Sequence, residues 1–175
     1  LIGTPRFNGD NRPLNSVFVF DHQAGLRGVY DKRHLVPFGE YVPFRSWIPF
    51  LDIIAGPADF VAGSQNQLIA IPGIGQVQTL ICYEVIFAGH VVTPPPRPDL
   101  MVNVTNDAWF GATIGPWQHL YQAQLRAVEE GIPLLRVANT GISAAFDGFG
   151  RQLGSIPLGE RAYLDIAIPS VLTAP

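Results

Sequence analysis

The 175-residue chain contains little of what most ligand sites are built from. With a single cysteine, it can form neither an internal disulfide nor a thiolate metal cluster. Charged residues make up 14% of it, against about 25% in a typical globular domain, and the net charge of −3 excludes the basic surface of a nucleic-acid-binding protein. Apolar runs stay below the roughly 20 residues of a membrane-spanning helix. So few charges indicate a chain that rests against something apolar, such as a partner, a membrane or further parts of its own domain.

Neither end of the chain carries the signals of a complete protein. Residue 1 is leucine, no signal-peptide pattern follows it, and Leu1–Pro5 looks like the end of a strand entering a loop. The last residues, Pro169–Pro175, end without a cap. A length of 175 residues corresponds to one domain or part of one. We therefore expect a piece of a longer protein.

The hydrophobic patterning predicts a mixed α+β fold. One long helix is expected over 115–130, with Pro116 in its first turn and Gly131 past its end, and a short helix is expected from just after Cys82 to near Gly89. Alternating or continuous apolar runs predict strands at 15–21, 26–32, 67–71, 76–82, 100–104, 134–138, 142–146, 151–156 and 161–168. Several strands with so few helices favour α+β layers over an alternating βαβ arrangement.

The segment Phe44–Gly63 is unusually apolar for a loop, because it holds several large hydrophobic residues between prolines and glycines. The apolar side chains of such a loop are normally buried against another surface. The segment is either an arm packed on its own core or a lid or membrane-facing arm.

The single cysteine, Cys82, is either a buried apolar side chain or a nucleophile. It follows the strand-like run Gln76–Ile81 at a strand-to-helix junction, where the helix N-terminus can stabilise a thiolate. Lys32, at the end of another predicted strand, could supply a cation, and the Tyr83 N–H could donate to an oxyanion. Periodicity alone favours the buried thiol.

The residues of five sequence motifs favour the nucleophile instead. The first is Tyr30-Asp-Lys32-Arg-His-Leu-Val-Pro-Phe-Gly-Glu40-Tyr-Val-Pro43, and the second is Ile81-Cys82-Tyr83-Glu84. The others are Asn103-Val-Thr-Asn-Asp-Ala-Trp-Phe-Gly111, then Gln118-His119 with Arg126-Ala127, and last Asn139-Thr-Gly-Ile-Ser143. Together they resemble, over nearly the whole chain and in order, the nitrilase (carbon–nitrogen hydrolase) superfamily. The Leu-Val-Pro-Phe-Gly-Glu-Tyr-Val-Pro form is similar to the bacterial apolipoprotein N-acyltransferase family within it.

The resemblance implies an α-β-β-α sandwich with a Glu-Lys-Cys triad and no metal or cofactor. Cys82 would take a fatty acyl chain from a phospholipid as a thioester and pass it to the N-terminal amine of a diacylglyceryl-cysteine apolipoprotein. Lys32 would hold the oxyanion with the Tyr83 N–H, and Glu40 would support the lysine and the nucleophile. Tyr83 and Glu84 would support the cysteine. The implied location is the bacterial inner membrane, with the catalytic domain on the periplasmic side.

One element of the family's site is missing from this sequence. The family's general-base glutamate lies well upstream of the lysine, but the glutamates here are Glu40, Glu84, Glu129, Glu130 and Glu160. We therefore expect residues 1–175 to be a partial carbon–nitrogen hydrolase domain that lacks its N-terminal part and the flanking membrane helices. Such a chain should be inactive and poorly soluble by itself.

Two other functions stay open. One is a soluble nitrilase-type amidase that cleaves a small C–N bond with the same triad, although the motif wording and the apolar arm argue against it. The other is a non-enzymatic interaction module in which Cys82 is simply buried. A Cys-His dyad that uses His34 or His119 is weaker, because no orienting Asn or Asp is implied.

Several polar residues have ordinary structural interpretations. Asn106 and Asp107 are expected to cap a loop or helix, and Glu84 could pair with Arg126 on the long helix. The aromatic pair Trp109-Phe110 either shapes an acyl pocket or belongs to the core. The histidines His22, His34, His90 and His119 show no ligand spacing and are expected on the surface or in loops.

Overall fold

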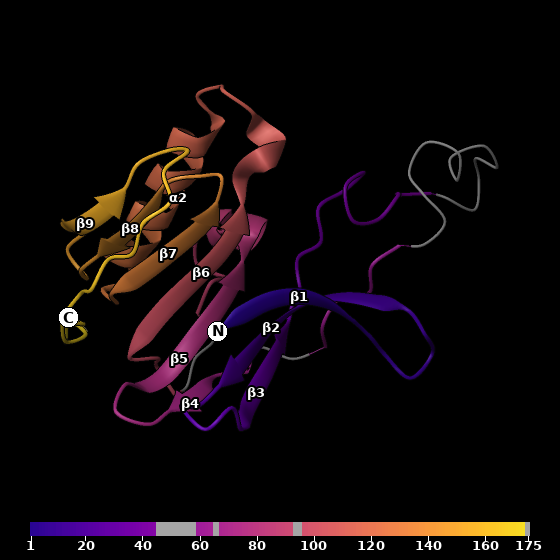
Figure 1. Cartoon of the computed structure of the whole chain (residues 1–175), viewed down its shortest axis with the longest axis horizontal. Coiled ribbons are helices and arrows are strands. Elements are labelled where there is room, and N and C mark those ends of the chain that lie inside the picture. The colour runs from indigo at the N-terminus through magenta and orange to yellow at the C-terminus, as the bar shows by residue number, and fades with distance from the viewer. Residues whose placement is uncertain (45–58, 65–66, 93–95, 174–175) are drawn as a thin grey trace. The chain divides into compact units, whose positions relative to one another are not determined.

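The computed structural model describes residues 1–44, 59–64, 67–92 and 96–173. These residues form two compact units, Leu1–Gln67 and Leu68–Pro175, each with a sheet of its own (Figure 1). Most of the predicted apolar arm, residues 45–58, lies outside the described residues.

The first unit contains an antiparallel three-stranded sheet in the order β1-β2-β3. Its strands are β1 (Ile2–Phe7), β2 (Pro13–Phe20) and β3 (Leu26–Asp31). Strands β2 and β3 form a hairpin, and the Asp21 carboxylate closes its turn by accepting hydrogen bonds from the backbone N–H groups of Gln23 and Gly25. Strand β3 ends at Asp31, one residue before the predicted end at Lys32.

The second unit contains a mixed six-stranded sheet in the order β4-β5-β6-β7-β8-β9. Its strands are β4 (Ile69–Ile71), β5 (Gly75–Ile81), β6 (Leu100–Asn106), β7 (Leu134–Asn139), β8 (Ser143–Phe146) and β9 (Gln152–Ile156). The three central strands β5, β6 and β7 run parallel, and the other pairs are antiparallel. Their carboxyl ends therefore meet at one edge, where ligand sites of α/β sheets form.

Among the described residues, three helical segments connect these strands. The 3₁₀ helix η2 (Cys82–Ile86) follows β5, the 3₁₀ helix η3 (Asp107–Phe110) follows β6, and α2 (Gly115–Glu130) leads to β7. The long helix was predicted over the residues it occupies, and Gly131 ends it with a left-handed φ of 61°. Among the described residues, none of the helices has the length and apolar character needed to cross a membrane.

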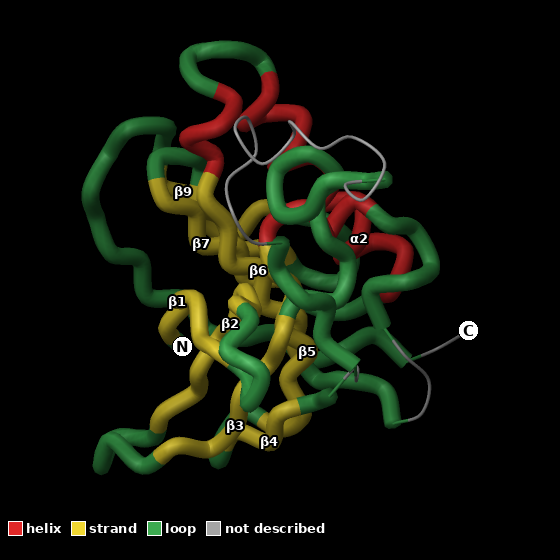
Figure 2. The backbone as a smooth tube through the Cα atoms, turned by 90° about the vertical axis from the view of Figure 1, so that its right-hand side faces the viewer, coloured by secondary structure: helices red, strands yellow, loops and turns green. Residues whose placement is uncertain are grey.

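Helix α2 covers one face of the six-stranded sheet (Figures 1 and 2). Leu120, Ala123 and Ala127 of α2 pack with Met101 of β6 and Leu134 of β7 in the larger core cluster. A smaller cluster lies on the other face of these strands and includes Val77, Leu100 and Val102. Because side chains alternate along a strand, β6 places Met101, Asn103 and Thr105 on the α2 side.

One predicted strand, residues 161–168, is wrong. The segment has no strand structure, and most of its residues are exposed. Its pattern alternates as a strand should, but a strand also needs a neighbour whose backbone groups are free to pair. Among the described residues it joins no sheet, and instead Leu164 and Ile166 lie beside Gly154 of β9.

Candidate active site

In the first unit, Lys32 and Glu40 form a close ion pair. The Lys32 ammonium lies 2.7 Å from the Glu40 carboxylate, with 1% and 13% of the two side chains exposed. Main-chain hydrogen bonds hold Lys32 on both sides, because its N–H donates to the Asn15 carbonyl and its carbonyl accepts from the Gly63 N–H, each at 2.8 Å. The backbone of Lys32 is therefore held on both sides, by β2 and by the segment that contains Gly63.

Glu40 is held by further donors. The Asn15 side-chain amide donates to Oε1 and the Val36 N–H donates to Oε2, both at 2.8 Å. Together with the Lys32 ammonium, these donors leave the carboxylate little freedom to move. A buried lysine with such a partner keeps its positive charge in a fixed place, as stabilisation of a developing anion requires.

In the second unit, Cys82 occupies the strained junction between β5 and η2. It is half-buried, and its φ of 50° places it in the left-handed region that non-glycine residues seldom adopt. Such a conformation costs about 1–2 kcal/mol and persists where the surroundings hold it. One support is the Glu84 carboxylate, which accepts a 2.7 Å hydrogen bond from the Ile81 N–H at the start of the 3₁₀ helix.

The carbonyl oxygen of Cys82 accepts two side-chain hydrogen bonds. The Asn103 amide donates to it at 3.3 Å and also donates to the Leu80 carbonyl at 3.3 Å. The His119 ring approaches the same Cys82 oxygen through Nε2 at 3.2 Å. Both groups come from the α2 side of the sheet, Asn103 from β6 and His119 from the buried face of α2.

These contacts belong to a buried polar cluster that is formed by Asn103, Thr105, Asp107, His119 and Arg136. Arg136 of β7 donates from Nη1 to the Asn103 side-chain oxygen and from Nη2 to the Asp107 carboxylate, both at 2.6 Å. The other Asp107 oxygen lies 2.9 Å from Nδ1 of His119 and accepts a 3.2 Å bond from the Thr105 hydroxyl. Strands β6 and β7 place Asn103 and Arg136 directly opposite each other.

Asp107 and Arg136 form an ion pair inside the cluster. Burial raises the pKa of Asp107, but the hydrogen bond from His119 and the charge of Arg136 outweigh it, so this pKa lies below its usual value. Burial lowers the pKa of Arg136, although the Asp107 carboxylate opposes this. The two side chains are fully buried, and each supplies the charge that the other needs.

The sequence does not predict this cluster, and two of its members, His119 and Asp107, differ from expectation. His22 and His90 are exposed, as predicted, and His34 is half-buried, but His119 is only 5% exposed. Asn106 does cap η3 by accepting from the Ala108 N–H, whereas Asp107 binds Arg136 and His119 instead. Asp107 is therefore an acidic residue that orients the His119 ring. The other ring nitrogen, Nε2, contacts the Cys82 carbonyl oxygen.

Other predicted partners differ from expectation. Arg126 pairs with Glu129 one turn away, and Glu84 binds the Ile81 N–H. Trp109 is 83% exposed, so of its two alternatives the core position is wrong. No group of three His, Cys, Asp or Glu side chains in the described ranges has a metal-binding arrangement.

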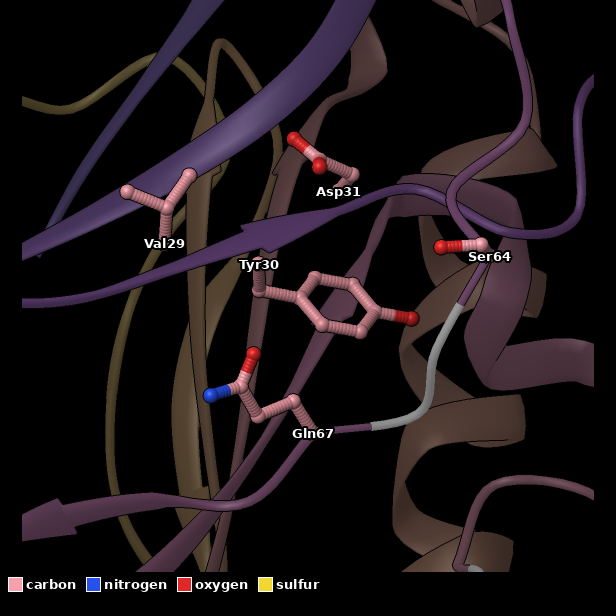
Figure 3. A pocket seen from close by; sticks show the side chains of 5 residues that line it. All are labelled: Val29, Tyr30, Asp31, Ser64 and Gln67. Atoms are coloured by element: carbon pink, nitrogen blue, oxygen red, sulfur yellow. The ribbon is translucent and has the colours of Figure 1, made fainter.

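The first unit also has a pocket of about 280 Å³ (Figure 3). It is lined by Val29, Tyr30 and Asp31 of β3 and by Ser64 and Gln67. Val29 and Asp31 project to one side of the strand and Tyr30 to the other. The Asp31 carboxylate already binds Arg6 and Ser16, and the lining is too polar for an acyl chain.

The predicted catalytic residues thus come from both units. Lys32 and Glu40 meet in the first, and Cys82, Tyr83 and Glu84 lie together in the second.

Comparison with known proteins identifies relatives over nearly the whole chain. The family model for carbon–nitrogen hydrolases matches residues 1–174. The apolipoprotein N-acyltransferase of Bradyrhizobium diazoefficiens is 44% identical over 171 residues, which cover 96% of this chain and 32% of that protein. The corresponding enzyme of Rhizobium rhizogenes is 45% identical over 157 residues, 88% of this chain and 30% of that protein. The chain therefore spans about a third of the length of these relatives.

Solved structures share the fold. A carbon–nitrogen hydrolase from Helicobacter pylori superposes with a TM-score of 0.64 at 15% identity, over 89% of this chain and 56% of that one. An amidase from Nesterenkonia sp. gives a TM-score of 0.63 at 22% identity, with the same two coverages. The predicted nitrilase-like α+β fold is confirmed.

Proposed function

Because this chain belongs to the carbon–nitrogen hydrolase family, we propose that it carries the nucleophile and oxyanion groups of an apolipoprotein N-acyltransferase. The observation that carries the proposal is the 44–45% identity to proteins of that name over most of this chain. The held Lys32–Glu40 pair and the strained Cys82 are the geometric support.

The proposed reaction has two acyl-transfer steps. The Cys82 thiolate attacks the ester carbonyl of a phospholipid, and the tetrahedral oxyanion is stabilised by the Lys32 ammonium and the Tyr83 N–H. The C–O bond then breaks, the lysophospholipid alkoxide takes up a proton, and a thioester remains on Cys82. The N-terminal amine of a diacylglyceryl-cysteine apolipoprotein attacks this thioester, loses a proton and leaves as the amide, so that the thiolate is restored.

Glu40 holds the Lys32 ammonium in place through this cycle. A cation that is already fixed near the reacting carbonyl stabilises the oxyanion without having to reorient during the reaction. Glu40 supplies the negative charge at 2.7 Å and is itself held by donors from Asn15 and Val36. Glu84, which binds the Ile81 N–H, and Tyr83 support the nucleophile through the 3₁₀ helix.

The proton-accepting glutamate of the reaction is not one of the five glutamates of this chain, in our proposal. We further propose that the partners are a phospholipid and an apolipoprotein at the bacterial inner membrane, on its periplasmic side. Residues 1–175 then form part of a carbon–nitrogen hydrolase domain. The 175-residue chain by itself should leave Cys82 unacylated in the presence of phospholipid.

Mass spectrometry of the full-length protein tests the proposal. After incubation with phospholipid vesicles, the peptide that contains Cys82 should gain the mass of one acyl chain, and a diacylglyceryl-cysteine lipopeptide should then remove it and become N-acylated. The Cys82→Ala variant is the negative control, because it lacks the thiol. An unmodified Cys82 together with hydrolysis of small amides would instead establish a nitrilase-type amidase. If the Cys82→Ala variant acylates the lipopeptide as well as the wild type does, this result contradicts the assignment of Cys82 as the nucleophile.

A further inference from the structure

We propose that His119 and Asn103 are positioning residues that hold the Cys82–Tyr83 peptide in the orientation needed for the oxyanion site, an inference that rests on the proposed function. Both side chains contact the Cys82 carbonyl oxygen, His119 through Nε2 at 3.2 Å and Asn103 through Nδ2 at 3.3 Å. Neither reaches the sulfur through these contacts. Their effect on the chemistry therefore passes through the backbone.

The donor roles follow from the acceptor. A carbonyl oxygen only accepts hydrogen bonds, so Nε2 of His119 must carry a proton in whichever state the ring adopts. The Asn103 amide is oriented by Arg136, whose Nη1 donates at 2.6 Å to the side-chain oxygen and so directs the NH₂ group toward Cys82. A His119 ring that donates to a backbone carbonyl does not serve as the base of a Cys-His dyad.

The geometry of the peptide bond turns this contact into a positioning effect. In a planar trans peptide, the C=O of one residue and the N–H of the next point in opposite directions. Because the Cys82 carbonyl points into the buried polar cluster, the Tyr83 N–H points away from it. Cys82 has a left-handed φ of 50°, so without these two donors the peptide could rotate towards a more favourable conformation.

The rest of the cluster keeps the two donors in place. Nδ1 of His119 lies 2.9 Å from the Asp107 carboxylate, which Arg136 in turn binds at 2.6 Å. His119, Asp107 and Arg136 are at most 5% exposed. Buried polar groups linked in this way are rigid, because each lost contact leaves an unpaired group in the interior.

A matched pair of variants in the full-length protein isolates the donor. In His119→Gln the side-chain NH₂ can take the place of Nε2 and still donate to the Cys82 carbonyl. In His119→Met the volume is similar but no donor remains. We expect His119→Met to lower kcat about 10²-fold with KM unchanged, as a misplaced reacting group does, and His119→Gln to retain most of the wild-type kcat.

The rates are measured on two substrates, so that the inference and the proposed function can fail separately. The first is acyl transfer from phospholipid to a lipopeptide. The second is the burst of p-nitrophenolate from p-nitrophenyl butyrate, which acylates Cys82 through a tetrahedral intermediate without either natural substrate. A burst without phospholipid-dependent transfer in the wild type would sink the proposed function, while the His119 pair would still test the inference through the burst rate.

Equal rates for His119→Gln and His119→Met, whether both high or both low, would overturn the inference, because packing alone would then explain the position. If neither variant folds, as judged by thermal unfolding, Asn103→Asp decides the question. It keeps an oxygen for Arg136 and removes the donor to Cys82. A wild-type burst rate in Asn103→Asp would then overturn the inference, and a loss of about 10²-fold would support it.

Discussion

The substitution Gly141→Ala should destabilise the protein, because the added methyl group would collide with Asp107. Gly141 lies in the connection between β7 and β8, and a Cβ atom built on it would sit 2.3 Å from Asp107 Oδ2 and 2.8 Å from the Ala138 Cβ. The backbone of Gly141 is not in the left-handed region, so alanine itself is not strained there. The cost falls on the Asp107 carboxylate, which must move.

The size of the effect follows from the contact that is lost. To restore an ordinary separation of about 3.4 Å, the carboxylate must shift by about 1 Å, which is enough to break its 2.6 Å bond to Arg136. Breaking a buried ion pair costs about 3–5 kcal/mol, and overpacking alone costs about 1–3 kcal/mol. We expect the free energy of unfolding to fall by about 3 kcal/mol, which corresponds to a Tm lower by about 6–12 °C where a domain of about 150–250 residues unfolds as one unit.

Thermal unfolding of the full-length protein, followed by circular dichroism, measures this change. The matched control is Gly9→Ala, because a Cβ at Gly9 would meet no atom within 4 Å and its φ is also ordinary. Gly9→Ala should leave Tm unchanged or raise it slightly. A Gly141→Ala protein whose Tm equals that of the wild type would refute the close contact and the rigid placement of Asp107.

Three further outcomes follow from the structure. Lys32→Met should lower kcat/KM for acyl transfer by about 10²–10³-fold, and Glu40→Gln should also lower it; wild-type rates in either would contradict the ion pair's role. Because the pKa of Asp107 is depressed, its ionised form favours the folded state, and this stability is lost as pH falls from about 4 through the folded pKa. The free energy of unfolding, measured with urea at pH values from about 3 to about 5, should therefore change less with pH in Asp107→Asn than in the wild type. Gly131→Ala should lower the free energy of unfolding by about 1–2 kcal/mol, measured the same way at neutral pH, because φ is 61° there.

Elements whose ends are set by residues close in the sequence could be predicted from the sequence. Helix α2 was predicted over its full extent because Pro116 and Gly131 mark its ends and apolar residues recur at helical spacing. The junction at Cys82 followed from the end of a β-type run before a short helix. The segment 161–168 was predicted wrongly for the complementary reason, since alternation reports which faces a strand would have but not whether a neighbour exists to pair with it.

The position of His119 was partly available from the sequence. It lies four residues before Ala123 and eight before Ala127, and all three face the core. Extending the apolar stripe of α2 through His119 would have predicted a buried histidine. Its partners could not be found in this way, because Asp107 and Arg136 come from two other elements that only the parallel arrangement of β6 and β7 brings together.

The difference between the two groups of site residues lies in the atoms through which they act. Lys32, Glu40 and Cys82 present side-chain charge or sulfur, so residue type and motif already indicate their chemistry. His119 and Asn103 contact a backbone carbonyl, and any residue at position 82 would offer that same oxygen. What makes the contact consequential is the φ of 50° at Cys82, a property of the folded backbone. Residues that hold a strained peptide therefore become visible only when the backbone conformation and the hydrogen bonds to it are considered together.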